Sequence, residues 1–358
     1  MLKLMVMPGF AQGLCAIGLL ACRCADGAGL LLLLTAANPP DDPFRAGLLA
    51  LERGDLVSAQ TNLEAASKLA PRDGRVWVAL SQTYWRQHRN TEAEEAASKA
   101  AALAPEDAAV LQSLAIYYSE TNQILKAAQA AAKYSAKVPE NHGARERASD
   151  LYFAAARPLL DSQKFIEAAV ILKEAVIQLP DSAQLQLALG VTDYGLRRFD
   201  EAAEAFLRTI EIAPETEQPY VFLGKILDQI PNRLGPVTAR FAEYESAHPG
   251  NAMGYLRHAK ALDAQSLEPE TALRLLEKSI AIDARDASAH FEMGTVLDRL
   301  QRFPEASAEF ARAVELAPSD AAAHYRLARD YDRIGKHESA QAEREKHAQL
   351  VKAQEVIR

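Results

Sequence analysis

Prolines recur along this chain at a nearly constant spacing. The series is Pro71, Pro105, Pro139, Pro180, Pro214, Pro249 and Pro318. Its successive gaps are 34, 34, 41, 34, 35 and 69, and the last gap is close to two periods with Ala284 standing where a proline is missing. A fixed period of this size is typical of a chain built from repeated supersecondary units. Such units stack in a line, because each one contacts mainly its neighbours.

Two series of small residues keep the same period. An alanine stands twelve or thirteen residues before most of the proline positions: Ala59, Ala93, Ala127, Ala168, Ala202, Ala272, Ala306 and Ala340. A second small residue stands about 24 positions before them: Gly47, Ser81, Ala115, Ala156, Gly190, Gly224, Ala259, Gly294 and Ala328. Small side chains let two helices approach closely, and proline cannot continue a helix. The pattern therefore predicts two antiparallel helices in each unit.

The unit from Ala287 to Asp320 resembles a tetratricopeptide repeat, with Gly294, Ala306 and Pro318 in the expected places. The resemblance covers about nine units, from Pro40 to the C-terminus. It implies an all-α fold, a right-handed α-solenoid of antiparallel helix pairs. The expected organisation is a signal or anchor over 1–37 and a solenoid over 38–358, with repeats roughly at 40–73, 74–107, 108–141, 142–182, 183–216, 217–251, 252–286, 287–320 and 321–358.

The first 37 residues are typical of a bacterial export signal. Lys3 supplies a positive charge, and the stretch from Leu4 to Leu20 is apolar apart from Gln12. The run that ends at Cys22 resembles a lipobox, which predicts lipidation of that cysteine. Small residues before Asn38 predict cleavage after Ala37 instead. An uncleaved anchor, or a start codon assigned too early, is a third interpretation.

We therefore expect an exported protein, which is periplasmic, membrane-anchored or secreted, with membrane attachment only through this segment. All three cysteines, Cys15, Cys22 and Cys24, lie in it. The remaining chain thus has no thiol for a disulfide, for a metal site or for catalysis.

The composition and the motifs argue against several functions. The chain has 48 acidic and 40 basic residues, which disfavours nucleic acid as a partner. No phosphate-binding loop, metal-binding motif or nucleophile motif occurs in the repeats. His290 and His324 hold equivalent positions in adjacent units, and we expect them to replace an aromatic residue of the family rather than to bind metal. The sequence therefore predicts no enzyme activity, no metal and no cofactor.

The repeat register breaks at two places. Seven extra residues between Pro139 and Pro180 predict that the first helix of the fourth repeat is about two turns longer, and we expect Pro158 to kink it. Pro236 occupies an alanine position in the sixth repeat. It predicts a late start of the second helix and an irregular loop over 231–235.

The resemblance implies that the first helix of each repeat faces a concave groove. The groove candidates in the last four repeats are Lys225, Asp228, Lys260, Asp263, Asp298, Arg299, Arg329, Asp332 and Arg333. Three of the pairs are spaced i,i+3, so we expect Lys225–Asp228, Lys260–Asp263 and Arg329–Asp332 to neutralise each other. Asp298 is also expected to reach the next repeat.

Two interpretations of these charges stay open. They form a network between repeats that fixes the stacking, or they anchor an extended peptide or a partner helix. In the N-terminal repeats Trp85 and Arg86 take the corresponding positions, and an exposed tryptophan there is a candidate binding hot spot.

These observations predict a non-catalytic scaffold of the cell envelope that binds protein or peptide segments. The alternatives are a self-assembling structural repeat protein and an accessory subunit of an envelope enzyme complex. The sequence determines neither the partner nor the oligomeric state.

Overall fold

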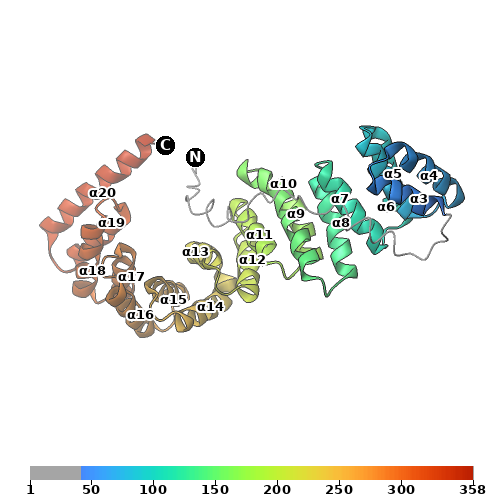
Figure 1. Cartoon of the computed structure of the whole chain (residues 1–358). Helices are drawn as coiled ribbons and strands as arrows, with labels where there is room; N and C mark the ends of the chain where they lie inside the picture. The colour runs from blue at the N-terminus through green and yellow to red at the C-terminus, as the bar shows by residue number, and fades with distance from the viewer. Residues whose placement is uncertain (1–41, 358) are drawn as a thin grey trace. The chain divides into compact units, whose positions relative to one another are not determined.

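The computed structural model describes residues 42–357, and these residues form eighteen α-helices and no strand (Figure 1). The expected export signal, including Cys22, lies outside the described residues. In chain order the α-helices are α3 (Pro43–Glu52), α4 (Leu56–Leu69), α5 (Gly74–Arg86), α6 (Asn90–Leu103), α7 (Ala108–Glu120), α8 (Ile124–Lys137), α9 (His142–Asp161), α10 (Phe165–Gln178), α11 (Ala183–Gly195), α12 (Phe199–Ile212), α13 (Glu217–Lys225), α14 (Leu234–Ala247), α15 (Ala252–Ala264), α16 (Pro269–Ile282), α17 (Ala287–Arg299), α18 (Phe303–Leu316), α19 (Ala321–Arg333) and α20 (His337–Ile357).

The helices follow one another in consecutive pairs, as the sequence predicts. The chain divides within α11 into two compact units, an N-terminal unit up to Ala188 and a C-terminal unit from Leu189. Among residues 42–357 no helix is both long enough and apolar enough to cross a bilayer.

Local signals explain where the helices begin and where they end. Aspartate caps the first helix of many pairs: Asp73, for example, accepts a hydrogen bond of 3.0 Å from the backbone N–H of Arg75. The turn inside many pairs carries one residue in the left-handed region, such as Asn122 with a φ of 57° and Gln301 with a φ of 61°. A left-handed residue at this place stops a helix and reverses the chain.

Small residues allow the two helices of a pair to approach closely. A Cβ atom added to Gly190 would lie 2.6 Å from Cε1 of Phe206, and one added to Gly294 would lie 2.8 Å from Cδ1 of Phe310. Gly224 is different, because an added Cβ would meet only Cγ of Arg257 at 3.6 Å. The predicted close approach is therefore wrong at Gly224, which stands next to the end of the short helix α13.

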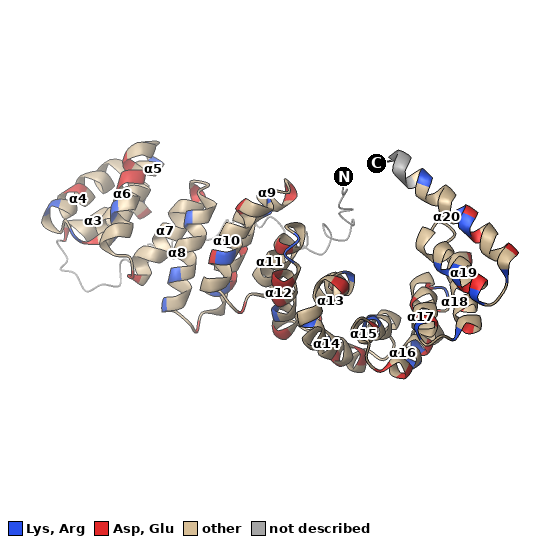
Figure 2. Cartoon of the chain, turned by 180° about the vertical axis from the view of Figure 1, so that it is seen from behind, with Lys and Arg blue, Asp and Glu red and all other residues tan. Residues whose placement is uncertain are grey.

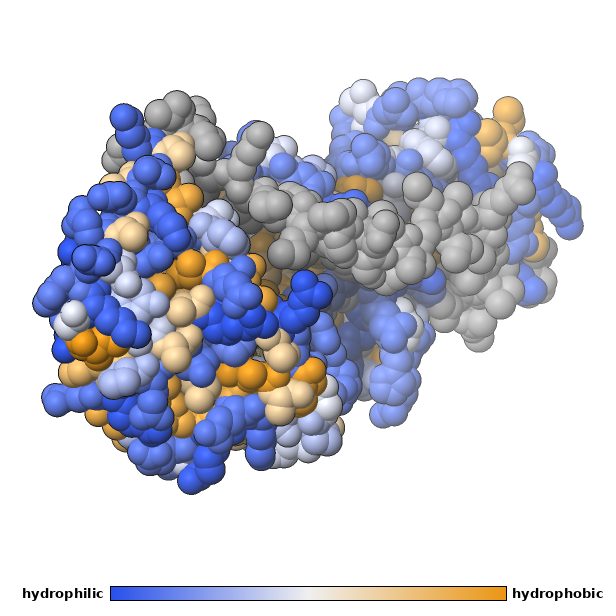
Figure 3. All heavy atoms as spheres, turned by 90° about the vertical axis from the view of Figure 1, so that its left-hand side faces the viewer, coloured by the Kyte–Doolittle hydropathy of each residue, from blue (hydrophilic) through white to orange (hydrophobic). Residues whose placement is uncertain are grey.

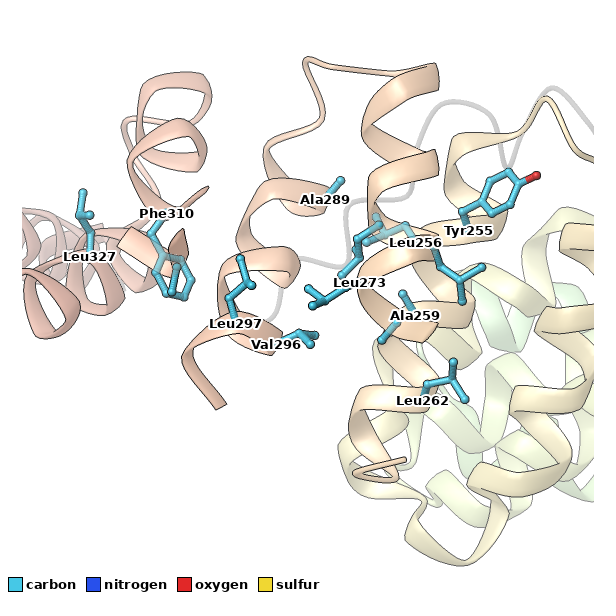
Figure 4. Packing of buried hydrophobic residues seen from close by; sticks show 14 residues of the cluster. Tyr255, Leu256, Ala259, Leu262, Leu273, Ala289, Val296, Leu297, Phe310 and Leu327 are labelled. Carbon is cyan, nitrogen blue, oxygen red and sulfur yellow. The ribbon is translucent and has the colours of Figure 1, made fainter. Parts of the chain in front are cut away.

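The apolar core of the C-terminal unit is continuous from α15 to α19. One cluster joins buried side chains of α15 to α19, from Leu256 through Leu273 and Val296 to Phe310 and Leu327. Figure 4 shows these side chains in a row that passes from helix to helix. No pair could bury this surface alone, so each pair depends on its neighbours.

The helix α9 has the predicted extra length. It spans 20 residues, whereas α5 and α7 span 13 each. The difference of seven residues equals about two turns. Pro158 lies inside the helix, four residues before its C-terminal cap.

The sixth repeat is irregular, but only in part as expected. The predicted late start of its second helix is wrong, because α14 begins at Leu234 and contains Pro236 in its first turn. A backbone N–H there has no partner inside the helix, so proline costs little. The predicted irregularity over 231–235 is present, because Pro231–Arg233 forms the short 3-10 helix η2. It extends further back than expected: α13 has only nine residues, and a 3-10 helix, η1 (Leu227–Gln229), follows it.

A repeated hydrogen bond ties the first helix of many pairs to the end of the preceding repeat. A side chain near the start of the helix contacts the carbonyl oxygen six residues earlier, which belongs to the proline position. The six contacts are Trp77–Pro71, Gln186–Pro180, Tyr220–Pro214, Tyr255–Pro249, His290–Ala284 and His324–Pro318. His290 and His324 thus do what tyrosine and tryptophan do in other repeats, as the sequence predicts.

We expect Tyr220→Phe to lower the free energy of unfolding by about 1 kcal/mol. The phenol of Tyr220 is buried and donates to the carbonyl of Pro214 at 3.1 Å. The substitution leaves that carbonyl without its donor. Urea unfolding measures the loss, with Tyr325→Phe as control, because half of Tyr325 is exposed. An equal loss in both variants would contradict the role given to this hydrogen bond.

Candidate functional site

The first helices of the C-terminal pairs bring the predicted groove residues together. Within this unit α13, α15, α17 and α19 lie on the inner side of the curve, and α14, α16 and α18 lie outside (Figure 1). Acidic and basic residues occur together on α17 and α19 (Figure 2). The face that Figure 3 shows is mostly hydrophilic, with smaller apolar patches between the polar residues. The first helices that carry the predicted groove residues therefore bear charges of both signs.

Ion pairs connect α15 with α17. The ammonium of Lys260 lies 2.9 Å from Oε1 of Glu292, and the guanidinium of Arg299 contacts the carboxylate of Asp263. Arg299 also donates to the backbone carbonyl of Asp263 at 2.8 Å. Both pairs join one repeat to the next.

Three arginines of α19 surround one carboxylate of α17. Asp298 is only 8% exposed, and Arg329 and Arg333 contact its two carboxylate oxygens. A third arginine, Arg326, lies 3.5 Å from Oδ2 of Asp298. Each of these three arginines remains about one third exposed. The prediction that Asp298 reaches the next repeat is therefore confirmed.

The series of charges ends on the last helix. Asp332 of α19 contacts Arg344 of α20, and its Oδ1 lies 3.3 Å from Nδ1 of His337. These contacts and the hydrogen bonds from Arg344 and His337 lower the pKa of Asp332. We call the groups that link α15, α17, α19 and α20 the charge ladder; its members are Lys260, Asp263, Glu292, Asp298, Arg299, Arg326, Arg329, Asp330, Asp332, Arg333 and Arg344.

The expected pairing within single helices is wrong. Lys260 and Asp263 each have partners on α17, and Arg329 binds Asp298 instead of Asp332. In the described part of the chain no ion pair joins Lys225 to Asp228, which lies beyond the end of α13 in η1. Lys225 instead lies 5.8 Å from the ring centroid of Phe222. Lys260, Asp263 and Arg329 therefore pair with charged residues of a neighbouring repeat instead of with their i,i+3 partners.

Burial opposes ionisation of two aspartates in the charge ladder. It raises the pKa of Asp263, although Arg299 acts in the opposite direction. The pKa of Asp330 rises to about 6, first through burial and then through the charge of Asp298, while Arg333 and Arg329 oppose the rise. Among the described residues, no group bonds to Oδ2 of Asp330.

We expect Asp330→Asn to change how stability depends on pH. Folding raises the pKa of Asp330, so the folded chain binds this proton more tightly than the unfolded chain, and stability from this group increases as pH falls. The unfolding free energy of the wild type minus that of the variant should rise by on the order of 2 kcal/mol between about pH 7 and pH 4.

Asp332→Asn is the matched control, since the pKa of Asp332 is lowered in the fold. The unfolding free energy of the wild type minus that of Asp332→Asn should fall as the pH falls, and mainly below about pH 4. Urea unfolding over a pH series measures both. If the difference in unfolding free energy between the wild type and Asp330→Asn did not change with pH, this would contradict the raised pKa of Asp330.

The two equivalent histidines pair with glutamates of the second helix in their own repeats. Nδ1 of His290 lies 2.7 Å from Glu309, and Nδ1 of His324 lies 2.5 Å from Glu343. Their other ring nitrogens face the carbonyls of Ala284 and Pro318. In the part of the chain that the structure describes, no group of three or more potential ligands could hold a metal ion.

The N-terminal candidates take separate roles. Arg86 donates to the backbone carbonyl of Leu51 at 3.3 Å, which joins two repeats. Trp85 is half-buried and lines a pocket at the ends of α5 and α7. The structure thus gives Arg86 a stacking contact and leaves Trp85 accessible.

Sequence reasoning missed four members of the charge ladder: Glu292, Arg326, Asp330 and Arg344. They do not lie at the positions of the first helices from which the groove candidates were predicted. A signal was available, because Arg326 and Arg333 flank Arg329 at spacings that place all three on one helix face.

Family comparisons decide which repeat this is. One tetratricopeptide repeat model matches residues 50–117, and a second matches residues 153–216, 256–321 and 291–345, together more than half of the chain. The chain belongs to the tetratricopeptide repeat family. Repeats of this family form protein-interaction scaffolds, and the chain is a scaffold of this kind. A comparison with curated proteins found no match.

Several solved structures of tetratricopeptide repeat proteins are similar to parts of the chain. MamA from Desulfovibrio magneticus RS-1 (residues 41 to its end) is 19% identical, with a TM-score of 0.41 over 48% of this chain and 96% of that one. TTC0263 from Thermus thermophilus is 23% identical, with a TM-score of 0.40 over 47% of this chain and 91% of that one. YrrB, described as having an unusual peptide-binding site, is 17% identical, with a TM-score of 0.35 over 60% of this chain and 91% of that one.

Proposed function

We propose that this tetratricopeptide repeat protein is an exported, non-catalytic scaffold of the bacterial cell envelope. It binds a protein or peptide segment along the charge ladder of its C-terminal unit. Family membership supports the scaffold role, and the apolar, cysteine-containing N-terminal sequence supports export. No activity is assigned to the repeats, because their sequence carries no catalytic motif.

The main support for the binding proposal is that the arginines of the charge ladder on α19 are partly exposed to solvent. Arg326, Arg329 and Arg333 share one buried carboxylate, so three positive charges face Asp298 and Asp330. Each guanidinium has five donors, and its contacts to Asp298 use only part of them. The remaining donors can bind the backbone carbonyls or the carboxylates of an extended segment.

A pull-down from envelope fractions tests this site. Arg326→Gln removes the arginine farthest from Asp298 and leaves the contacts of Arg329 and Arg333 in place. We expect recovery of the bound protein to fall several-fold. The matched control is Arg312→Gln, which removes an arginine of similar exposure from the second helix α18. Equal recovery with both variants, or no partner with the wild type, would contradict the proposal.

The identity of the mature N-terminus tests whether the protein is exported. Mass spectrometry of the protein from envelope fractions should find an N-terminus at Asn38, or a lipid on Cys22. The sequence leaves these two outcomes open. An unprocessed chain that starts at Met1 and stays in the cytoplasmic fraction would contradict export.

A second candidate function is self-assembly, and the surface of α10 favours it. Ile166, Val170 and Ile177 are each more than two thirds exposed and lie along one face of this helix. If two copies of α10 pack antiparallel with Val170 on the twofold axis, each Glu167 meets Lys173 of the other copy. Opposite charges then flank an apolar contact.

Light scattering on the full chain distinguishes this candidate. It predicts a dimer for the wild type and a monomer for Val170→Glu. The control Val57→Glu places the same charge at a similarly exposed valine of α4 (75% against 68%) and should leave the dimer intact. A monomeric wild type would exclude assembly through α10.

A further inference from the structure

One arginine of the C-terminal unit is buried without a partner. Arg257 of α15 is only 9% exposed, and among the described residues its side chain forms no ion pair and no hydrogen bond. Burial lowers the pKa of Arg257, and Tyr244 and Glu217 oppose this without bonding to it. A buried charge that lacks a partner is costly to a fold, so the retention of Arg257 needs an explanation.

The stem of Arg257 is buried, but its tip reaches the solvent. Cγ of Arg257 would lie 3.6 Å from a Cβ added to Gly224, so the stem lies against α13 of the preceding repeat. Within the described chain, none of the guanidinium nitrogens is among the fully buried side-chain atoms that lack a partner. The donors of this guanidinium are therefore open to a ligand.

The next two repeats show which partner a charge at this position has. Glu292 of α17 and Arg326 of α19 stand two residues before the small residue of their helices, as Arg257 does. Glu292 lies 2.9 Å from Lys260, and Arg326 lies 3.5 Å from Asp298. Both partners belong to the first helix of the preceding repeat. A charge at this position therefore binds an opposite charge one repeat earlier.

Neither of the equivalent partners is in place for Arg257. The residue equivalent to Lys260 is Lys225, which has the same sign as Arg257. The residue equivalent to Asp298 is Asp228, but α13 ends at Lys225, and Asp228 lies beyond it in η1. The break in α13 thus leaves Arg257 without the carboxylate that α17 supplies to α19.

We propose that an aspartate or glutamate side chain of the bound partner supplies this missing carboxylate. It accepts hydrogen bonds from the guanidinium of Arg257, as Asp298 does from the arginines of α19. The exposed Lys225, which forms no ion pair with another described residue, adds a second positive charge on the adjacent first helix. The site rests on the function proposed above and adds to it the chemistry of the partner, an acidic segment at α13 and α15.

Fluorescence anisotropy with a dye-labelled tetra-glutamate peptide tests the proposal. Both ends of the peptide are blocked, so only side-chain carboxylates are offered to the full-length protein. The chain has a net charge of −8, which repels this peptide in general, so saturable binding needs a local positive site. We expect saturable binding that Arg257→Gln weakens by at least about fivefold. No saturable binding, or equal affinity in the wild type and the variant, would overturn the proposal.

A matched substitution separates this site from a general effect of charge. Arg312→Gln removes the same charge from the second helix α18, where the arginine is 41% exposed, and should leave the affinity for tetra-glutamate unchanged. Blocked tetra-glutamine is the neutral peptide and should not bind. Equal weakening by Arg257→Gln and Arg312→Gln would contradict a site at Arg257.

Stability distinguishes a recognition residue from a structural one. An apolar side chain of similar length removes a buried charge that has no partner, so we expect Arg257→Met to unfold at the same or a higher urea concentration than the wild type. The same variant should bind tetra-glutamate more weakly. A clearly lower urea midpoint would show that Arg257 supports the fold, and this would contradict its retention for binding.

The pull-down with Arg326→Gln tests the scaffold function separately. A partner that the wild type recovers and Arg326→Gln loses would support binding along the charge ladder. If tetra-glutamate then bound equally well to the wild type and to Arg257→Gln, the scaffold function would stand and the site at Arg257 would be rejected.

Discussion

Replacing Phe310 by alanine is expected to lower the free energy of unfolding of the C-terminal unit by about 3–5 kcal/mol. The ring of Phe310 is fully buried and packs edge-on against Phe291, with centroids 5.6 Å apart. It also covers Gly294, where no side chain could fill the space that the ring leaves. The substitution thus removes apolar burial and opens a cavity between α17 and α18 (Figure 4).

Urea unfolding followed by circular dichroism measures this loss, and hydrogen exchange locates it. Protection should fall first in α17 and α18, because each pair contacts only its neighbours. Tyr325→Ala is the control, since Tyr325 is 51% exposed and its loss should change stability by less than about 0.5 kcal/mol. A loss below about 1 kcal/mol for Phe310→Ala would contradict the packing described here.

Replacing Asp298 by alanine is expected to cost about 2 kcal/mol. Breaking a buried ion pair costs about 3–5 kcal/mol, because it leaves an uncompensated charge. Here the arginines that lose their partner are about one third exposed, so water recovers part of that energy. Asp330 lies beside Arg333 at 3.1 Å and also compensates partly.

Asp332→Ala is the matched control for this substitution. Asp332 also contacts an arginine, but its side chain is 38% exposed, against 8% for Asp298. We expect a much smaller loss of stability, and one that high salt removes. Urea unfolding at low and at high salt compares the two. Equal losses would mean that burial does not determine how much each ladder member stabilises the stacking.

Much of the fold could be predicted from the sequence, because the repeat forces small residues into fixed places. Gly190 and Gly294 lie against buried phenylalanines as expected. The longer helix α9 followed from counting residues between prolines. Pro236 misled the prediction, because proline is tolerated in the first turn of a helix and so does not delay its start.

The candidate site was predicted in part. The positions on the first helices identified Asp298, Arg299 and Arg333, but not which residues pair with each other. Pairing depends on which side chains of two stacked helices face each other, and spacing along one helix does not contain that information. Lys260 shows this clearly, because its partner is Glu292 of the next repeat rather than the nearby Asp263.

The pocket at Trp85 illustrates the same limit. The sequence indicated an unusual tryptophan, but the pocket needs the turns of two repeats to come together around it. Glu94 and Lys126 are far apart in the sequence, and only stacking makes them an ion pair. Sites between repeats therefore need the structure even where the repeat itself is evident from the sequence.

Crosslinking mass spectrometry on the protein purified from its native cells tests the central claim most directly. Lysines report on both faces of the C-terminal unit: Lys225 and Lys260 lie on first helices, and the exposed Lys278 lies on the second helix α16. We expect crosslinks from a partner protein to Lys225 and Lys260, and few to Lys278. Crosslinks concentrated on Lys278, or none to any other protein, would contradict a scaffold that binds its partner along the charge ladder.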